Sequence, residues 1–190
     1  MDNYLKIVNF LGKNIGKSFT MHGLSNLTNI PYASLYRAVQ QIKDILDIEI
    51  VGNAKTVRLR TNKRVVKAYL IISSDEEQKE FLEKHLILRK ITNELDTNDV
   101  IVLFGSYAKS KEVERSDIDI LVVNKKGDKS LSFYKYELLF EKKINPIFVT
   151  SKEFKGMLKD KEENVGKQAL KNHIILNNPD GFWEMVLDGI

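Results

Sequence analysis

Two short apolar runs constrain the fold of this chain more than any other feature. Residues 100–104, VIVLF, are continuously apolar, and residues 117–123, DIDILVV, are apolar apart from two aspartates one residue apart. Apolar runs of this length, bounded by turn residues such as the intervening Gly-Ser pair, are typical of buried strands. Because strand side chains alternate between two faces, Asp117 and Asp119 lie on one face, where their charges repel. A bound cation would remove that conflict, whereas a solvated polar strand face is the alternative.

The spacing within this segment resembles a known family. Gly105-Ser106 is followed by ten residues and then by Asp117-Ile118-Asp119, flanked by FGSYA and SDIDILV. This pattern resembles the minimal nucleotidyltransferase group of the DNA polymerase β superfamily, over about residues 85–190. The resemblance implies an α/β (α+β) nucleotidyltransferase fold, with a mixed sheet flanked by helices. It also implies transfer of a nucleotide, AMP from ATP, to a hydroxyl acceptor.

The residue types in the motif suit this chemistry. Glycine lets the backbone approach a phosphate closely, and helix-start amides with the Ser106 hydroxyl can hold a triphosphate. Asp117 and Asp119 are the predicted metal ligands and catalytic residues, since Mg²⁺ prefers oxygen ligands. Two Mg²⁺ ions about 4 Å apart would activate the attacking oxygen and stabilise the leaving pyrophosphate. Gly105, Ser106 and Lys109 are the predicted nucleotide-binding residues, with a solvated surface role as the alternative for Lys109.

The chain departs from the pattern of the family at two positions. Ser110 stands where the family usually has glycine, and Asn145 stands where a later strand carries a third carboxylate. Asn145 is the third predicted catalytic residue. It can ligate a metal through its carbonyl oxygen, but it cannot accept the proton of an attacking hydroxyl. Pro146 lacks a donor for the strand ladder, which predicts an edge or end strand.

The charge distribution divides the chain. Residues 1–74 contain eleven basic and four acidic residues, a balance of +7, whereas residues 75–190 have a balance of −3. Such an asymmetry indicates two units with different partners. We expect a first domain at residues 1–65, a connector helix at 66–84 and a nucleotidyltransferase domain at 85–190.

The basic part has its own resemblance. Its apolar spacing predicts helices at residues 4–11, 20–30 and 31–46 and a β-hairpin at 48–60 with a Gly-Asn turn. This order resembles the winged helix-turn-helix family, in which the third helix enters the DNA major groove. The predicted DNA-binding residues are Arg37, Lys43, Lys55, Arg58 and Arg60. Docking onto a protein is the alternative function.

The connector carries helical signals. Ser74, with Glu77 three residues on, predicts a capping box that starts a helix at Asp75. The apolar face of that helix is predicted to include Phe81, Leu82, His85 and Leu86, with either Leu88 or Ile91. His85 is predicted to be a packing residue without a functional role.

Composition excludes other classes. The chain has no cysteine, which excludes thiol catalysis and disulfides. It has no long apolar run and no signal-peptide pattern, so no membrane association and a cytoplasmic location are expected. The predicted partners are ATP or another nucleoside triphosphate, double-stranded DNA and a HEPN-type protein of a toxin–antitoxin pair. The alternative function is a DNA-binding regulator or antitoxin whose transferase domain only binds nucleotide.

Overall fold

The computed structural model describes residues 1–61 and 64–190. The chain divides into two compact units, Met1–Glu76 and Glu77–Ile190. Residues 62 and 63, which fall within the predicted first domain, lie outside the described residues. Within the described ranges, no helix has both the length and the apolar character needed to cross a membrane.

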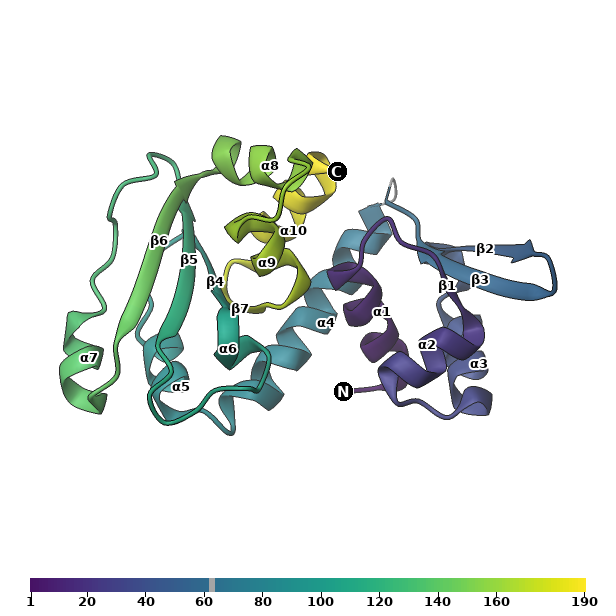
Figure 1. The fold of residues 1–190 in the computed structure, drawn as a ribbon, viewed down its shortest axis with the longest axis horizontal. Coiled ribbons are helices and arrows are strands. Elements are labelled where there is room, and N and C mark those ends of the chain that lie inside the picture. The colour runs from purple at the N-terminus through teal and green to yellow at the C-terminus, as the bar shows by residue number, and fades with distance from the viewer. Residues whose placement is uncertain (62–63) are drawn as a thin grey trace. The chain divides into compact units, whose positions relative to one another are not determined.

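The described part of the first unit contains three helices, then a hairpin, and ends within the next helix, α4 (Arg64–Leu82; Figure 1). Its elements before α4 are α1 (Asn3–Lys13), β1 (Phe19–Thr20), α2 (Met21–Thr28), α3 (Tyr32–Gln41), the 3-10 turn η1 (Lys43–Ile45), β2 (Leu46–Val51) and β3 (Ala54–Leu59). The three strands form an antiparallel sheet in the order β1-β3-β2. The predicted hairpin is confirmed, and Gly52, at φ +59°, lies at its turn.

Local capping determines where these helices begin. The Thr20 side chain accepts a hydrogen bond from the Gly23 N–H, which starts α2. Pro31 is the N-cap of α3. The third helix was predicted to reach residue 46 but ends at Gln41. Leu46 instead pairs with Leu59 in the sheet and is buried, and this pairing takes the chain out of the helix.

The predicted capping box is wrong. Helix α4 (Arg64–Leu82) runs through this segment without a break, and the Ser74 hydroxyl donates to the Leu70 carbonyl within the helix. Val66 and Leu70 are fully buried. Their packing stabilises the turns before Ser74, so the local capping signal has no free helix end to cap.

The second unit contains a mixed four-stranded sheet flanked by helices, as predicted. After α4 its described elements are α5 (Leu86–Asn93), β4 (Val100–Phe104), α6 (Gly105–Ala108), β5 (Ile118–Asn124), α7 (Tyr134–Phe140), β6 (Ile144–Thr150), α8 (Ser151–Lys159), α9 (Val165–Lys171), β7 (Ile174–Asn177) and α10 (Pro179–Gly189). The strand order is β6-β5-β4-β7, with β5 and β6 parallel and the other pairs antiparallel. Strand β6, which contains Pro146, is an edge strand, so that prediction is confirmed.

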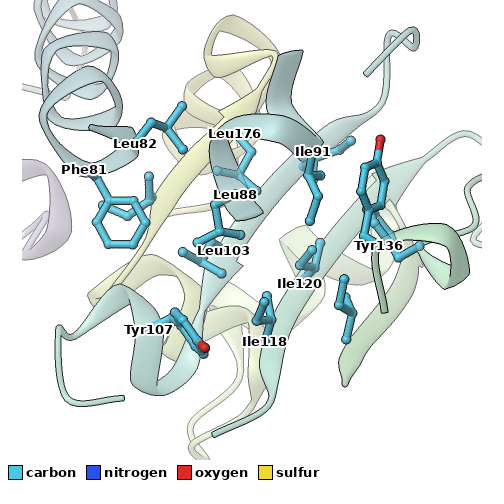
Figure 2. Packing of buried hydrophobic residues seen from close by; sticks show 14 of the residues in the cluster. Phe81, Leu82, Leu88, Ile91, Leu103, Tyr107, Ile118, Ile120, Tyr136 and Leu176 are labelled. Carbon is cyan, nitrogen blue, oxygen red and sulfur yellow. The ribbon is translucent and has the colours of Figure 1, made fainter. Parts of the chain in front are cut away.

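Side chains from both faces of this sheet are buried. On one face, Ile118 and Ile120 of β5 belong to the same apolar cluster as Leu88 and Ile91 of α5 (Figure 2). Helices α8, α9 and α10 also lie against β4 and β5. Because strand side chains alternate, Asp119 points away from the face that carries Ile118 and Ile120. Leu86, which was predicted to be buried, is 64% exposed.

Candidate active site

The register of the sheet brings the predicted site residues together. Asp119 on β5 pairs with Phe104, the residue before Gly105, and with Asn145 on the other side. Asp117 lies just before the first residue of β5. The C-terminal end of β4 and the N-terminal ends of β5 and β6 therefore lie next to one another at the same end of the sheet.

The Asn145 side chain joins the two carboxylates. Its amide nitrogen Nδ2 donates to Asp117 Oδ2 over 3.1 Å and to Asp119 Oδ1 over 3.4 Å. The Lys143 Nζ lies 3.4 Å from Asp117 Oδ2. These donors offset the repulsion between the two carboxylates that the sequence predicts.

Gly105 is required by the approach of Asp119. Its φ is +76°, in the left-handed region, and a Cβ at this position would lie 2.2 Å from Asp119 Oδ2. No side chain larger than hydrogen fits there without moving the carboxylate. The glycine of the motif therefore makes room for a carboxylate of the same site, a role that the sequence interpretation did not include.

The turn after Gly105 is followed by a residue whose backbone conformation favours glycine. Gly105 begins the single helical turn α6, and the Ser106 carbonyl accepts from the Lys109 and Lys111 amides. Ser110 has φ +51°, a conformation that glycine adopts at little cost. The serine at this position is therefore in a conformation that strains its backbone.

Lys109 has an acidic neighbour. The pKa of the Glu163 carboxyl is lowered, mainly by its hydrogen bond to Lys171, and the charges of Lys167 and Lys109 add to the effect. Lys109 is exposed. The positive charge of Lys109 therefore interacts with the Glu163 carboxylate, in addition to any phosphate bound at the Gly-Ser turn.

The site offers oxygen ligands for a divalent cation. No group of three or more His, Cys, Asp or Glu side chains that could hold a metal occurs in residues 1–61 and 64–190. The available donors are the carboxylates of Asp117 and Asp119 and the amide oxygen of Asn145. Such oxygen donors fit Mg²⁺, and the room left by Gly105 keeps the Asp119 carboxylate close to the turn.

Two polar residues near the site were missed by the sequence interpretation. Lys143 lies two residues before Asn145, so the period of two along a strand could have placed it beside Asp117. Glu112 lies in the ten-residue segment between Ser106 and Asp117. Nothing in the local sequence distinguishes it from its charged neighbours.

The predicted DNA-binding residues have mixed surroundings. Arg58 Nε lies 3.2 Å from Asp47 Oδ2, and Arg60 Nε lies 2.8 Å from Asp47 Oδ1. Lys55 Nζ lies 5.6 Å from the centroid of the Tyr36 ring. Arg37 and Lys43 are exposed, on α3 and η1 respectively. Acidic groups on the hairpin thus reduce the positive potential at both of its arginines.

Comparison with known proteins agrees with the geometry of the second unit. Residues 86–173 match the family described as the nucleotidyltransferase domain. Over 61 residues the chain is 41% identical to the "Putative protein adenylyltransferase" of Methanocaldococcus jannaschii. That alignment covers 32% of this chain and 59% of the relative. No solved structure gives a significant match to the chain.

Proposed function

We propose that the chain transfers AMP from Mg²⁺-bound ATP to a hydroxyl group on a partner protein. One observation carries this proposal: the Asn145 amide donates to both Asp117 and Asp119, beside a turn where only glycine fits. The match to the nucleotidyltransferase domain supports the reaction class. The name of the archaeal relative supports AMP as the transferred group and a protein as the acceptor.

Each residue of the site has a role in this reaction. Asp117 and Asp119 would hold Mg²⁺, together with the Asn145 carbonyl oxygen once the amide group turns its nitrogen away from the carboxylates. When bound, the ion supplies positive charge that stabilises the α-phosphate. The Ser106 hydroxyl and the amides of the turn bind the phosphates, and Lys109 adds positive charge. The acceptor oxygen forms a bond to the α-phosphorus as the bond to the bridging oxygen breaks, and pyrophosphate leaves. Asn145 accepts no proton, so the acceptor hydroxyl loses its proton to water without help from a general base of the site.

The reaction is tested by the substitution Asn145→Asp. General-base assistance is worth roughly 10²–10⁴ in rate, so we expect Asn145→Asp to transfer AMP faster than the wild type. The measurement is incorporation of labelled AMP into a co-expressed HEPN-type candidate partner, with Asp119→Asn as the inactive control. The variant also exchanges an amide donor for a third carboxylate, so without Mg²⁺ its Tm should fall below that of the wild type.

The contrary outcomes separate the two functions that the sequence leaves open. A variant no faster than a measurable wild type would mean that another group acts as the base. If both proteins bind Mg²⁺-ATP but modify no candidate acceptor, the regulatory function replaces the enzymatic one. In that case the second unit would only bind nucleotide.

DNA binding is the second proposed function, and it belongs to the first unit. Its support is the order of three helices followed by a hairpin, together with the exposed positions of Arg37 and Lys43. Both fit a winged helix-turn-helix domain that contacts double-stranded DNA. The two functions are compatible in a regulator or antitoxin of a toxin–antitoxin pair.

A further inference from the structure

One acidic side chain of the loop between α6 and β5 points inward. Most side chains from Lys109 to Arg115 are exposed, including Val113, which is 69% exposed. Glu112 is half-buried, and its Oε2 atom is buried without a hydrogen-bond partner among the described residues. Burying a glutamate and exposing a valine reverses the usual preference. The burial of Glu112 therefore has a cause other than apolar packing.

The cause lies at the junction of α4 and α5. The His85 ring stacks on the Phe81 ring, with centroids 3.9 Å apart and planes 10° apart, and its edge faces Tyr107. Its Nδ1 lies 2.8 Å from the Phe81 carbonyl oxygen, and its Nε2 lies 3.1 Å from Glu112 Oε1. The His85 side chain is 14% exposed. The ring is thus held on one side by α4 and on the other by the loop.

The two contacts can both be hydrogen bonds only if the pair carries a certain number of protons. The Phe81 carbonyl only accepts, so Nδ1 carries a hydrogen. An ionised Glu112 also only accepts, so Nε2 must then carry a second hydrogen and the ring is an imidazolium. If the ring is neutral, Glu112 must be protonated and donates to Nε2. Both forms hold one proton more than a neutral imidazole and a free carboxylate. Losing that proton leaves one ring hydrogen for two acceptors, so the ring can keep only one of its bonds to Phe81 and Glu112.

We propose that His85 and Glu112 form a one-proton latch that holds the loop preceding Asp117 in its nucleotide-binding arrangement. The inference rests on the proposed function. The loop begins at the Gly-Ser turn, where the Lys111 amide donates to the Ser106 carbonyl. It ends at Asp117, which precedes the strand and is not itself in the β5 ladder. His85 and Glu112 are positioning residues, acting through the turn and through Asp117.

Three variants of the full chain distinguish the latch from simple packing. Glu112→Ala removes it. Glu112→Gln keeps it without an ionisable proton, because the glutamine amide can donate to Nε2 of a neutral His85. Glu114→Gln, two residues along the same loop and exposed, is the matched control.

The first measurement is the Kd for Mg²⁺-ATP from about pH 5 to about pH 9, the range in which histidine commonly loses its proton. In the described part of the chain, the titratable side chains shown to face His85 are Glu112 and Tyr107. We expect the affinity of the wild type to fall about tenfold as the pH rises, if about a tenth of the loops stay in place unlatched. Glu112→Gln should bind as the wild type does at low pH and should lack this fall. Glu112→Ala should bind weakly throughout, and Glu114→Gln should follow the wild type.

The second measurement is hydrogen exchange of the amides of residues 109–116 without nucleotide. Faster exchange in Glu112→Ala alone supports the latch. Unchanged exchange, or a pH-dependent fall in affinity that Glu112→Gln shares with the wild type, overturns it. If the wild type does not bind Mg²⁺-ATP at all, the proposed function fails, and the exchange rates alone decide for or against the latch.

Discussion

At Gly105 a single methyl group would collide with a carboxylate of the candidate site. We expect Gly105→Ala to lower the free energy of unfolding by about 1–3 kcal/mol, because a left-handed backbone is strained for alanine. It should also abolish stabilisation by Mg²⁺-ATP, since Asp119 must move away from a Cβ 2.2 Å from its Oδ2. Thermal unfolding with and without Mg²⁺-ATP measures both effects.

Gly16 provides the matched control for that substitution. Its φ is +79°, and a Cβ there would meet no atom within 4 Å. Gly16→Ala should therefore show the backbone cost but keep the stabilisation by Mg²⁺-ATP. Equal loss of that stabilisation in both variants would contradict the role given to Asp119.

Replacing Ser110 by glycine should stabilise the protein. A left-handed residue other than glycine costs roughly 1–2 kcal/mol, and the extra unfolded-state freedom of glycine costs roughly 0.5–1 kcal/mol. Ser110→Gly should thus raise the free energy of unfolding by about 0.5–1 kcal/mol, as measured by urea denaturation. Lys111→Gly, one residue on and not among the positive-φ residues, should lower it instead. A Ser110→Gly protein less stable than the wild type would show that the serine side chain stabilises the turn.

At the scale of elements, charged groups link α5 to α7. Glu94, at the end of α5, accepts hydrogen bonds from Lys135 and from the Tyr136 hydroxyl, each of which belongs to α7. With Lys90 they lower the pKa of the Glu94 carboxyl from 4.5 to about 2, and Lys135 makes the largest contribution. The charged form of Glu94 is therefore favoured by folding.

This link should be lost in acid. Because the folded pKa is the lower one, the stabilisation is complete above about pH 4.5 and disappears as the pH falls towards 2. Glu94→Gln should lower the Tm at pH 7 by no more than about 3 °C, because the pair is exposed. The difference from the wild type should shrink as the pH is lowered through this window. A difference that is constant with pH would mean that packing, not charge, carries the effect.

At the scale of the whole molecule, the two proposed functions belong to different units. Replacing Arg37, Lys43 and Lys55 by alanine should weaken binding to duplex DNA and reduce its salt dependence by about 0.9 in log–log slope per lost contact. The affinity for Mg²⁺-ATP should stay within a few-fold of the wild type. Fluorescence anisotropy at several salt concentrations measures the first quantity, and calorimetry measures the second.

The hairpin arginines serve as a comparison. Arg58 and Arg60 are paired with Asp47, so a phosphate must compete with that carboxylate. Replacing them should weaken DNA binding less per residue than replacing Arg37. Absence of DNA binding by the wild type even at low salt would indicate that the first unit docks onto protein.

The sequence alone determined the parts of this protein that depend on nearest neighbours. The period of two and the Gly-Asn turn predicted the hairpin, short apolar runs predicted the two strands flanking the Gly-Ser turn, and Pro146 predicted the edge position of β6. The same alternation placed Asp117 and Asp119 on one face, and the resemblance to the nucleotidyltransferase group added Asn145 to them. These signals are local in the chain, so they can be read without the fold.

Only the tertiary structure decided the contacts between distant residues. Burial of Val66 and Leu70 continued α4 through Ser74, where the local capping signal predicted a helix start. The fold turned Glu112 toward His85, 27 residues away, although its neighbours in the loop are also charged. It also paired Arg58 and Arg60 with Asp47 on the opposite strand. Which charged side chains pair depends on which residues the fold packs together, and no local sequence pattern specifies those partners.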